Sequence, residues 1–266
     1  MTKFIAWGQR IFPKAIAQPP GNSLGIIDAA YEAGYDGIEL DLRITKDRAL
    51  VLMHDDGVEK TTLGTGRISQ MTLEQATALR LRDEREGVWE FVPSFAQALL
   101  RNGSRGYVMV DLRKLNPVSE GALSSAIEIA KFDPRLLIFL AYTASEGLRY
   151  QELWPNSIVM LKAPMGLKPP ELTAEFVEQA GAIEAVIAPI FAFPEVVAEF
   201  RERTRKAGKM LGVYLHHQGP DKLRQIMAAK PDFITSMNPT HFAAMRKEFG
   251  LAEAVFDQHE AIVALD

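Results

Sequence analysis

Cysteine is absent from this chain of 266 residues. Without thiols the protein has no disulfide framework, no cysteine-ligated zinc and no thiol nucleophile, and its composition suits a reducing compartment. The sequence also lacks any apolar run of about 18 residues, the length that a membrane-spanning helix needs. The apolar stretch in residues 1–7 is too short for a signal peptide. We therefore expect a cytoplasmic protein with no integral membrane segment.

The chain also lacks an excess of positive charge. The formal net charge is −4, and no basic run with interleaved aromatic residues occurs, which argues against nucleic-acid binding. Hydrophobic residues make up 47% of the chain, enough for one domain with a sizeable core. No linker-like segment interrupts it. We expect residues 1–266 to form a single domain, with a helical tail at 251–266 that packs on this domain or on a second subunit of a homo-oligomer.

Short apolar runs typical of buried strands alternate with helical patterns along the chain. The expected strands are 4–7, 37–41, 107–111, 136–141, 158–161, 185–188, 211–215 and 233–235. The expected helices are 23–33, 73–81 with 94–100, 120–130, 145–153, 170–180, 194–207, 220–228 and 241–249. Eight alternations of strand and helix predict an α/β fold, a parallel (β/α)₈ TIM barrel.

One further strand, 49–53, follows strand 37–41 after only a short turn at Lys46 and Asp47. Parallel neighbours need a crossover of about a dozen residues, so this pair must form a small β-hairpin insertion after the second strand. Antiparallel register would pair residues whose numbers sum to about 93. His54 then returns opposite Glu39 and Leu40.

Two acidic side chains share one face of the second strand. Alternation places Glu39 and Asp41 about 7 Å apart on the same side. The C-terminal ends of barrel strands converge on one mouth, where Asp111 of the next strand would join them. Neighbouring acids repel one another, and carboxylate oxygens suit Mg²⁺ or Ca²⁺. We predict one such cation on these three residues; the alternatives are solvated acids at a strand end, or Asp111 paired with Arg113.

Several other side chains stand at strand ends, where a substrate would bind. They are Gln9, Arg10, Arg113, Tyr142, Lys162, His216 and His217. His54 beside the acids would be a metal ligand or an acid/base catalyst. Lys162 would contact a phosphate or carboxylate, and Tyr142 would line the substrate pocket. The competing interpretations are a histidine capping a strand, a solvated lysine and an aromatic residue that only packs.

Three spaced elements together resemble the glycerophosphodiester phosphodiesterase family, within the phospholipase-C-like phosphodiesterase superfamily of TIM barrels. They are the run Ile-Glu-Leu-Asp-Leu-Arg-Ile-Thr-Lys-Asp at 38–47, the strand ending in His54-Asp55, and the stretch 61–68 followed by Met-Thr-Leu at 71–73. The resemblance implies that Glu39, Asp41 and Asp111 bind one divalent ion. It also implies that this ion and Arg10 hold a phosphate. The planar guanidinium of an arginine can bind two phosphate oxygens at once.

The chain departs from the family pattern at three places. Where the family has His-Arg-Gly and later Glu-Asn-Thr, this chain has Gln9-Arg10-Ile11 and then Gly-Asn-Ser at 21–23. Glutamine cannot exchange a proton near neutral pH, so the usual scheme with two histidines cannot operate unchanged. On the third strand, Asp111 and Arg113 stand where glutamate and lysine are usual.

Three consequences of the missing histidine remain open. His54 acts alone, first taking and then returning a proton, which suits an internal cyclisation. Alternatively His216 or His217 replaces the lost histidine, and strand alternation lets only one of them face the mouth. In the third case phosphodiester chemistry is lost and the metal site acts on another substrate.

The function that we predict is a metal-dependent phosphodiesterase. It acts on a glycerophosphodiester-like small molecule by hydrolysis or internal cyclisation, with His54 as the acid/base group. Two alternatives stay open: a metal-dependent lyase or aldolase that uses the same carboxylates, and a catalytically silent ligand-binding homologue.

Overall fold

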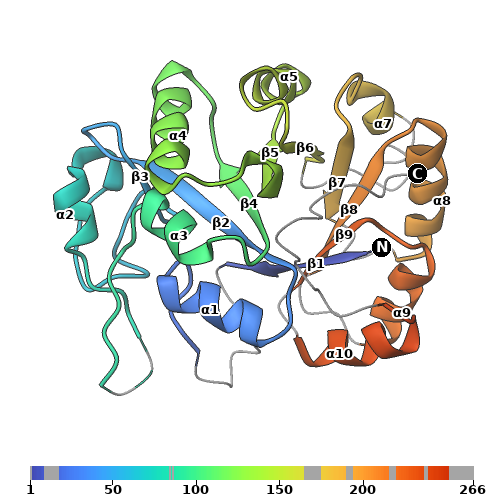
Figure 1. Ribbon diagram of the computed structural model, residues 1–266, viewed down its shortest axis with the longest axis horizontal. Helices are drawn as coiled ribbons and strands as arrows, with labels where there is room; N and C mark the ends of the chain where they lie inside the picture. Colours follow the sequence, from blue (N-terminus) through green and yellow to red (C-terminus); the bar gives the residue numbers. More distant parts are fainter. Residues whose placement is uncertain are drawn as a thin grey trace.

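The computed structural model describes residues 2–8, 18–83, 85, 87–164, 175–189, 194–215, 220–236 and 239–251. In this part of the chain, eight parallel strands form a closed barrel (Figure 1). They are β1 Lys3–Trp7, β2 Gly37–Ile44, β4 Tyr107–Leu112, β5 Leu137–Ala141, β6 Ile158–Lys162, β7 Ala185–Pro189, β8 Met210–Leu215 and β9 Phe233–Ser236. Strand β1 pairs with both β2 and β9, which closes the sheet. The predicted TIM barrel is confirmed.

Helices lie between successive strands and cover the outside of the barrel (Figure 1). They are α1 Leu24–Glu32, α3 Phe95–Asn102, α4 Pro117–Ala130, α5 Ala144–Leu153, α7 Glu175–Gln179, α8 Pro194–Lys206, α9 Pro220–Ala228 and α10 Pro239–Glu248. Polar side chains fix where several of them begin. Ser23 accepts from the backbone N–H of Ile26 at the start of α1, and Asn116 precedes Pro117 at the start of α4.

The core lies between the barrel and its helices. Leu40 and Leu42 of β2 are fully buried in it. On α5, the Tyr150 ring stacks on Phe139 of β5 with centroids 4.5 Å apart. Because side chains alternate along a strand, Leu40 and Leu42 face the surrounding helices, and Glu39 and Asp41 point into the barrel interior.

The hairpin strand is β3, Leu50–Leu52, which runs antiparallel to the end of β2. Leu42 pairs with Leu52, so paired numbers sum to 42 + 52 = 94, one more than predicted. The backbone N–H of Met53 donates to the Asp41 carbonyl at 3.0 Å. This hydrogen bond places the end of the hairpin, just before His54, next to Asp41, as expected.

The hairpin belongs to a larger insertion, residues 45–93, that also contains η1 Ile68–Gln70 and α2 Leu73–Thr77. It has its own small hydrophobic cluster of Val51, Met53, Val58, Ile68, Ala76, Leu81 and Val92. The helix expected over 73–81 is too long, because α2 ends at Thr77 and Leu81 forms a β-bridge with Thr62. Leu81 fills the insertion core from that extended segment.

The start of β5 also differs from expectation. Residues Pro134–Leu136 form a short 3₁₀ turn, η2, so β5 begins one residue later than predicted. The tail expected over 251–266 lies outside the described residues after Leu251. None of the helices in the described ranges combines the length and apolar character needed to cross a bilayer.

Candidate active site

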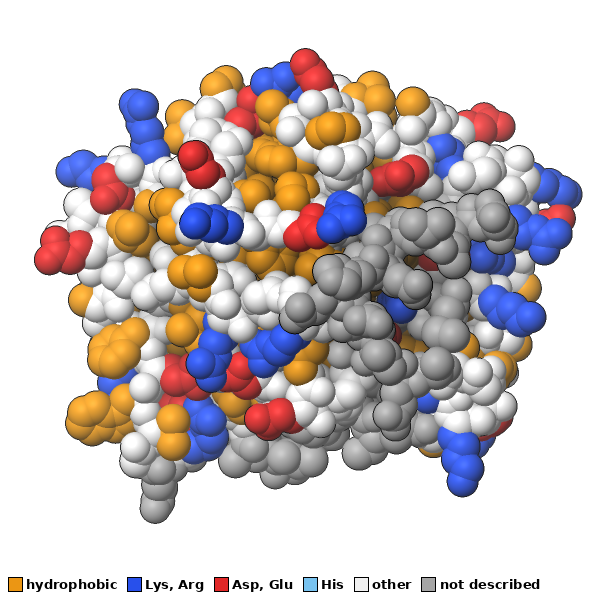
Figure 2. Space-filling model, in the orientation of Figure 1, with side chains coloured by type: hydrophobic (Ala, Val, Ile, Leu, Met, Phe, Trp, Pro, Cys, Tyr) orange, Lys and Arg blue, Asp and Glu red, His pale blue; other side chains and the backbone are white. Residues whose placement is uncertain are grey.

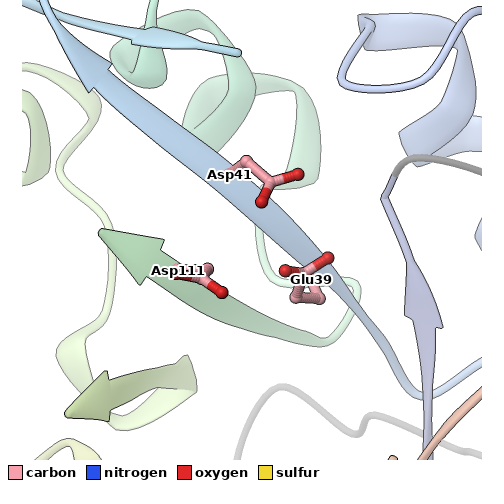
Figure 3. Close-up of side chains that lie close together, drawn as sticks. All are labelled: Glu39, Asp41 and Asp111. Atoms are coloured by element: carbon pink, nitrogen blue, oxygen red, sulfur yellow. The ribbon is translucent and has the colours of Figure 1, made fainter. Parts of the chain in front are cut away.

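Three buried carboxylates meet inside the C-terminal mouth of the barrel (Figure 3). Glu39 and Asp41 come from β2 and Asp111 from β4, where Asp41 and Asp111 are register partners. One oxygen from each carboxylate lies within 4.8 Å of the others. The side chains predicted to converge therefore do so, through strand alternation and the parallel pairing of β2 with β4.

Burial and mutual repulsion act on the protonation of this cluster. Burial, followed by the charges of Asp41 and Asp111, raises the pKa of Glu39 well above its ordinary value. Burial would also raise the pKa of Asp111, but the Lys162 ammonium and the Tyr142 hydroxyl outweigh it and lower that pKa. The Lys162 ammonium is in direct contact with the cluster, and the guanidinium groups of Arg43 and Arg113 act on it electrostatically.

Lys162 and Tyr142 both form hydrogen bonds with Asp111. The Lys162 Nζ lies 2.7 Å from Oδ2, and the Tyr142 hydroxyl donates to Oδ1 at 2.6 Å. Lys162 is also 3.3 Å from the Tyr142 hydroxyl oxygen and 5.3 Å from the Tyr214 ring centroid. The partner of Asp111 is therefore a lysine from β6 rather than the nearby Arg113, which binds elsewhere.

Backbone and amide groups hold the other two acids. The Asn22 side chain donates to Asp41 Oδ2 at 2.9 Å and accepts from the Asp41 backbone N–H at 3.1 Å. The Gly8 backbone N–H donates to Glu39 Oε2 at 3.3 Å. A side chain at Gly8 would put Cβ 2.0 Å from the Glu39 carbonyl oxygen, so this close approach requires glycine.

Sequence reasoning gave neither Gly8 nor Asn22 a role. One signal for Asn22 was present, because an asparagine directly before a serine N-cap tolerates the left-handed backbone that it adopts here, with φ 56°. Nothing local indicates that this loop contacts Asp41.

His54 is held at both ring nitrogens. Its Nδ1 lies 2.8 Å from Asp55 Oδ1, and its Nε2 lies 2.8 Å from an Arg113 guanidinium nitrogen. The Arg43 guanidinium also donates to the His54 backbone carbonyl. Arginine has only donors, so Nε2 accepts from Arg113 and Nδ1 carries the proton that it donates to Asp55. Arg113 follows Asp111 by two residues in the chain, so this network places His54 near the acid cluster.

Four of the predicted site residues, Gln9, Arg10, His216 and His217, lie outside the described residues. Their roles stay predictions. The described side chains suffice to test whether a divalent cation suits the site. Three buried carboxylates bring oxygens within 4.8 Å of one another, and oxygens are the ligands that Mg²⁺ and Ca²⁺ prefer. Among the described residues Lys162 is the one cation in direct contact with them. The residues fit such an ion.

Comparison with known proteins places the chain in a family. The model of the glycerophosphoryl diester phosphodiesterase family matches residues 15–153, more than half of the chain. A glycerophosphodiester phosphodiesterase of Caldanaerobacter subterraneus subsp. tengcongensis is 28% identical over 236 residues, covering 86% of this chain and 93% of that protein. Human glycerophosphodiester phosphodiesterase 1 is 47% identical over 60 residues, which cover 23% of this chain and 18% of that protein.

Solved structures share the fold. A glycerophosphodiester phosphodiesterase from Agrobacterium tumefaciens superposes with a TM-score of 0.72 at 22% identity, covering 92% of this chain and all (100%) of that chain. An Oleispira antarctica phosphodiesterase in complex with the product sn-glycerol-3-phosphate gives a TM-score of 0.68 at 17% identity, with 91% and 96% covered. Because the family model matches more than half of the chain, this chain belongs to the glycerophosphoryl diester phosphodiesterase family.

Proposed function

We propose that this protein is a metal-dependent phosphodiesterase that cleaves a glycerophosphodiester-like small molecule. Family membership supports the reaction class. The observation that supports metal dependence is the set of three buried carboxylates with oxygens within 4.8 Å of one another. Glu39, Asp41 and Asp111 would hold one Mg²⁺ or Ca²⁺, which when bound offsets negative charge on the phosphate oxygens.

The phosphate is bound by the cations of this chain. Arg113 is exposed and its only described polar partner is His54, so it can rotate to present two N–H groups to a phosphate. Lys162 is less free, because Asp111 and Tyr142 fix its ammonium on the other side of the cluster. Arg10, outside the described residues, is the third cation that we expect on the phosphate. Tyr142 forms one wall of the pocket.

His54 moves the proton. When Arg113 turns to the phosphate, the Nε2 lone pair is released, while Asp55 keeps the ring oriented through Nδ1. Nε2 then takes the proton of the attacking hydroxyl as its oxygen bonds to phosphorus. The bond from phosphorus to the leaving alcohol oxygen breaks, and Nε2 returns the proton to that oxygen.

One histidine can serve both halves of this exchange. In a cyclisation the attacking hydroxyl belongs to the substrate glycerol, and the products are a cyclic phosphate and an alcohol. In a hydrolysis water attacks, and the products are a phosphomonoester and an alcohol. Gln9 favours the cyclisation, because it removes the second family histidine; His216 or His217 would restore a second group for hydrolysis.

Phosphorus NMR tests the proposal. The purified protein is incubated with glycerophosphocholine and, separately, with a lysophospholipid, in Mg²⁺, in Ca²⁺ and in a chelator. We expect a new phosphomonoester or cyclic phosphate signal that the chelator abolishes and that Glu39→Gln does not produce. The identity of the signal separates hydrolysis from cyclisation. No new signal with either metal would contradict the proposed function.

A further inference from the structure

Three extended segments of the insertion, 61–63, 79–82 and 89–92, lie side by side. The β-bridges Thr62 to Leu81 and Arg80 to Phe91 join them. Backbone hydrogen bonds continue the ladder, with the Leu63 N–H donating to the Arg80 carbonyl at 2.9 Å. Because side chains alternate along extended segments, this small sheet has two distinct faces.

The inner face is apolar and packed. Thr62, Leu81 and Val92 are buried on it, with Leu79 against the same cluster. The residues of opposite parity form the outer face. We call this outer face the insertion face and define it by Leu63, Arg80, Arg82, Trp89 and Phe91.

The insertion face is unusually apolar for a surface. Trp89 is 66% exposed, Leu63 56% and Phe91 49%. Figure 2 shows hydrophobic side chains at the lower left of the molecule, where Figure 1 places the insertion. Exposed aromatic side chains gathered on one small sheet indicate an interaction surface.

Its described charged side chains are two arginines, Arg80 and Arg82. The Arg80 guanidinium lies 4.3 Å from the Trp89 ring centroid, and Arg82 donates only to the Glu59 backbone carbonyl, at 3.2 Å. In the described part of the chain no carboxylate is within ion-pair distance of either arginine. Elsewhere in the insertion, Lys60, Arg67 and Arg85 each pair with an acid at 2.6 to 3.2 Å. Among the described residues, the insertion face therefore places two arginines without an ion pair beside its exposed aromatic rings.

Residues next to the insertion face contact two segments that lead to the candidate active site. Glu90, in the third segment, accepts from the Gly25 backbone N–H at 2.8 Å, three residues after the Asn22 that binds Asp41. Lys60, next to the first segment, binds Asp55 at 3.1 Å, and Asp55 orients His54. A surface docked here would be held at the edge of the mouth.

We propose that the insertion face docks this protein on the surface of an anionic phospholipid bilayer. Tryptophan and phenylalanine suit the depth of the headgroups, and the arginines reach lipid phosphates from there. A second copy of the chain fits less well, because a two-fold contact through this face would bring its arginines together. The docking itself is independent of turnover; that it presents lipid phosphodiesters to His54 rests on the proposed function.

Vesicle sedimentation in a chelator tests the docking without turnover. We expect the protein to pellet with vesicles of phosphatidylglycerol and phosphatidylcholine, less so with pure phosphatidylcholine, and less at high salt. Trp89→Ser with Phe91→Ser lowers the affinity about tenfold or more. Arg80→Gln and Arg82→Gln each lower it about fivefold.

Exposed apolar residues elsewhere provide matched controls. Leu100→Ser and Ile129→Ser change side chains that are 58% and 63% exposed on α3 and α4, and should leave sedimentation unchanged. The insertion-face variants should keep the turnover of a water-soluble glycerophosphodiester that the unmodified protein shows. This readout separates failure of docking from failure of the proposed function.

Three outcomes would overturn the docking proposal. The first is an unmodified protein that does not pellet with anionic vesicles. The second is an equal loss of sedimentation in Ile129→Ser and in the Trp89 and Phe91 variant. The third is self-association in light scattering that depends on Trp89 and Phe91, without vesicle binding, which would identify a second copy as the partner.

Discussion

An Arg113 guanidinium nitrogen lies 2.8 Å from Nε2 of His54, and this hydrogen bond occupies the lone pair that a general base would use. Arg113 follows the cluster acid Asp111 by two residues, so the same arginine is within reach of a phosphate at the mouth. In the proposed mechanism, binding of the substrate phosphate and release of the base would be coupled through this one side chain.

Replacing Arg113 tests this coupling. In Arg113→Met we expect KM to rise about tenfold or more, since a charged hydrogen bond to phosphate is lost. Arg113→Lys should raise KM less, because a lysine still donates hydrogen bonds to the phosphate but lacks the planar guanidinium. Nitrogen NMR of the His54 ring should show a smaller fraction of the Nδ1-protonated tautomer in Arg113→Met. An unchanged tautomer in that variant would argue against the coupling.

Asp55 orients the His54 ring without touching the acid cluster in the described contacts. His54→Ala should lower kcat by about 10² to 10⁴ fold. Asp55→Asn should lower kcat by about tenfold and leave KM little changed, because the ring loses its charged acceptor. Lys60→Gln removes the other partner of Asp55 and serves as the control, with near-normal turnover expected. Full activity in His54→Ala would remove His54 from the mechanism.

Metal binding should appear in thermal stability. A cation that binds the folded state at 100 times its Kd adds about 2.7 kcal/mol to the free energy of unfolding. We expect Mg²⁺ or Ca²⁺ to raise Tm in the unmodified protein and a chelator to reverse it. Glu39→Gln should abolish this rise, while its metal-free form is at least as stable, because the variant relieves repulsion within the cluster. An identical metal-dependent rise in Glu39→Gln would place the ion elsewhere.

Lys162 should affect metal and substrate in opposite directions. Its ammonium lies 2.7 Å from Asp111 and so competes with a cation for that carboxylate. Lys162→Met should bind Mg²⁺ or Ca²⁺ more tightly in calorimetry, yet show a lower kcat/KM because a phosphate contact is lost. Weaker metal binding together with unchanged turnover would contradict both roles.

The ion pairs of Asp28 with Arg101 and Arg105 should make the stability of the folded state depend on pH. Burial alone would raise the pKa of Asp28, but hydrogen bonds from Arg101 and Arg105 outweigh it and lower that pKa. A lowered pKa stabilises the folded state above the unfolded value, and this contribution is lost as pH falls through the folded value. Asp28→Asn should lower Tm by about 2 °C at neutral pH, with the gap closing in acid.

A surface ion pair provides the control for that measurement. Asp221 pairs with Arg224 at 2.8 Å, but the aspartate side chain is 90% exposed. Asp221→Asn should therefore leave Tm unchanged across the same pH range. A gap between Asp28→Asn and the unmodified protein that persists in strong acid would show that the effect is not the charge of Asp28.

Local patterns in the sequence determined the barrel and the position of its acids. Apolar runs identify buried strands because parallel strands are covered on both faces. Alternation places Glu39 and Asp41 on one side, since the period of a strand is two residues. The turn at Lys46 and Asp47 requires a hairpin, because it is too short for a crossover. Each of these inferences depends on residues close together in the chain.

Tertiary structure alone decided the partners of the site residues. Asp111 pairs with Lys162, 51 residues away, and His54 with Arg113, 59 residues away. The sequence offered Arg113 as the partner of Asp111, and no local pattern favoured another choice. The insertion core likewise joins segments that periodicity assigned to one longer helix. Partners so far apart are chosen by the closure of the barrel and by packing, and neither is encoded in the period of a single strand or helix.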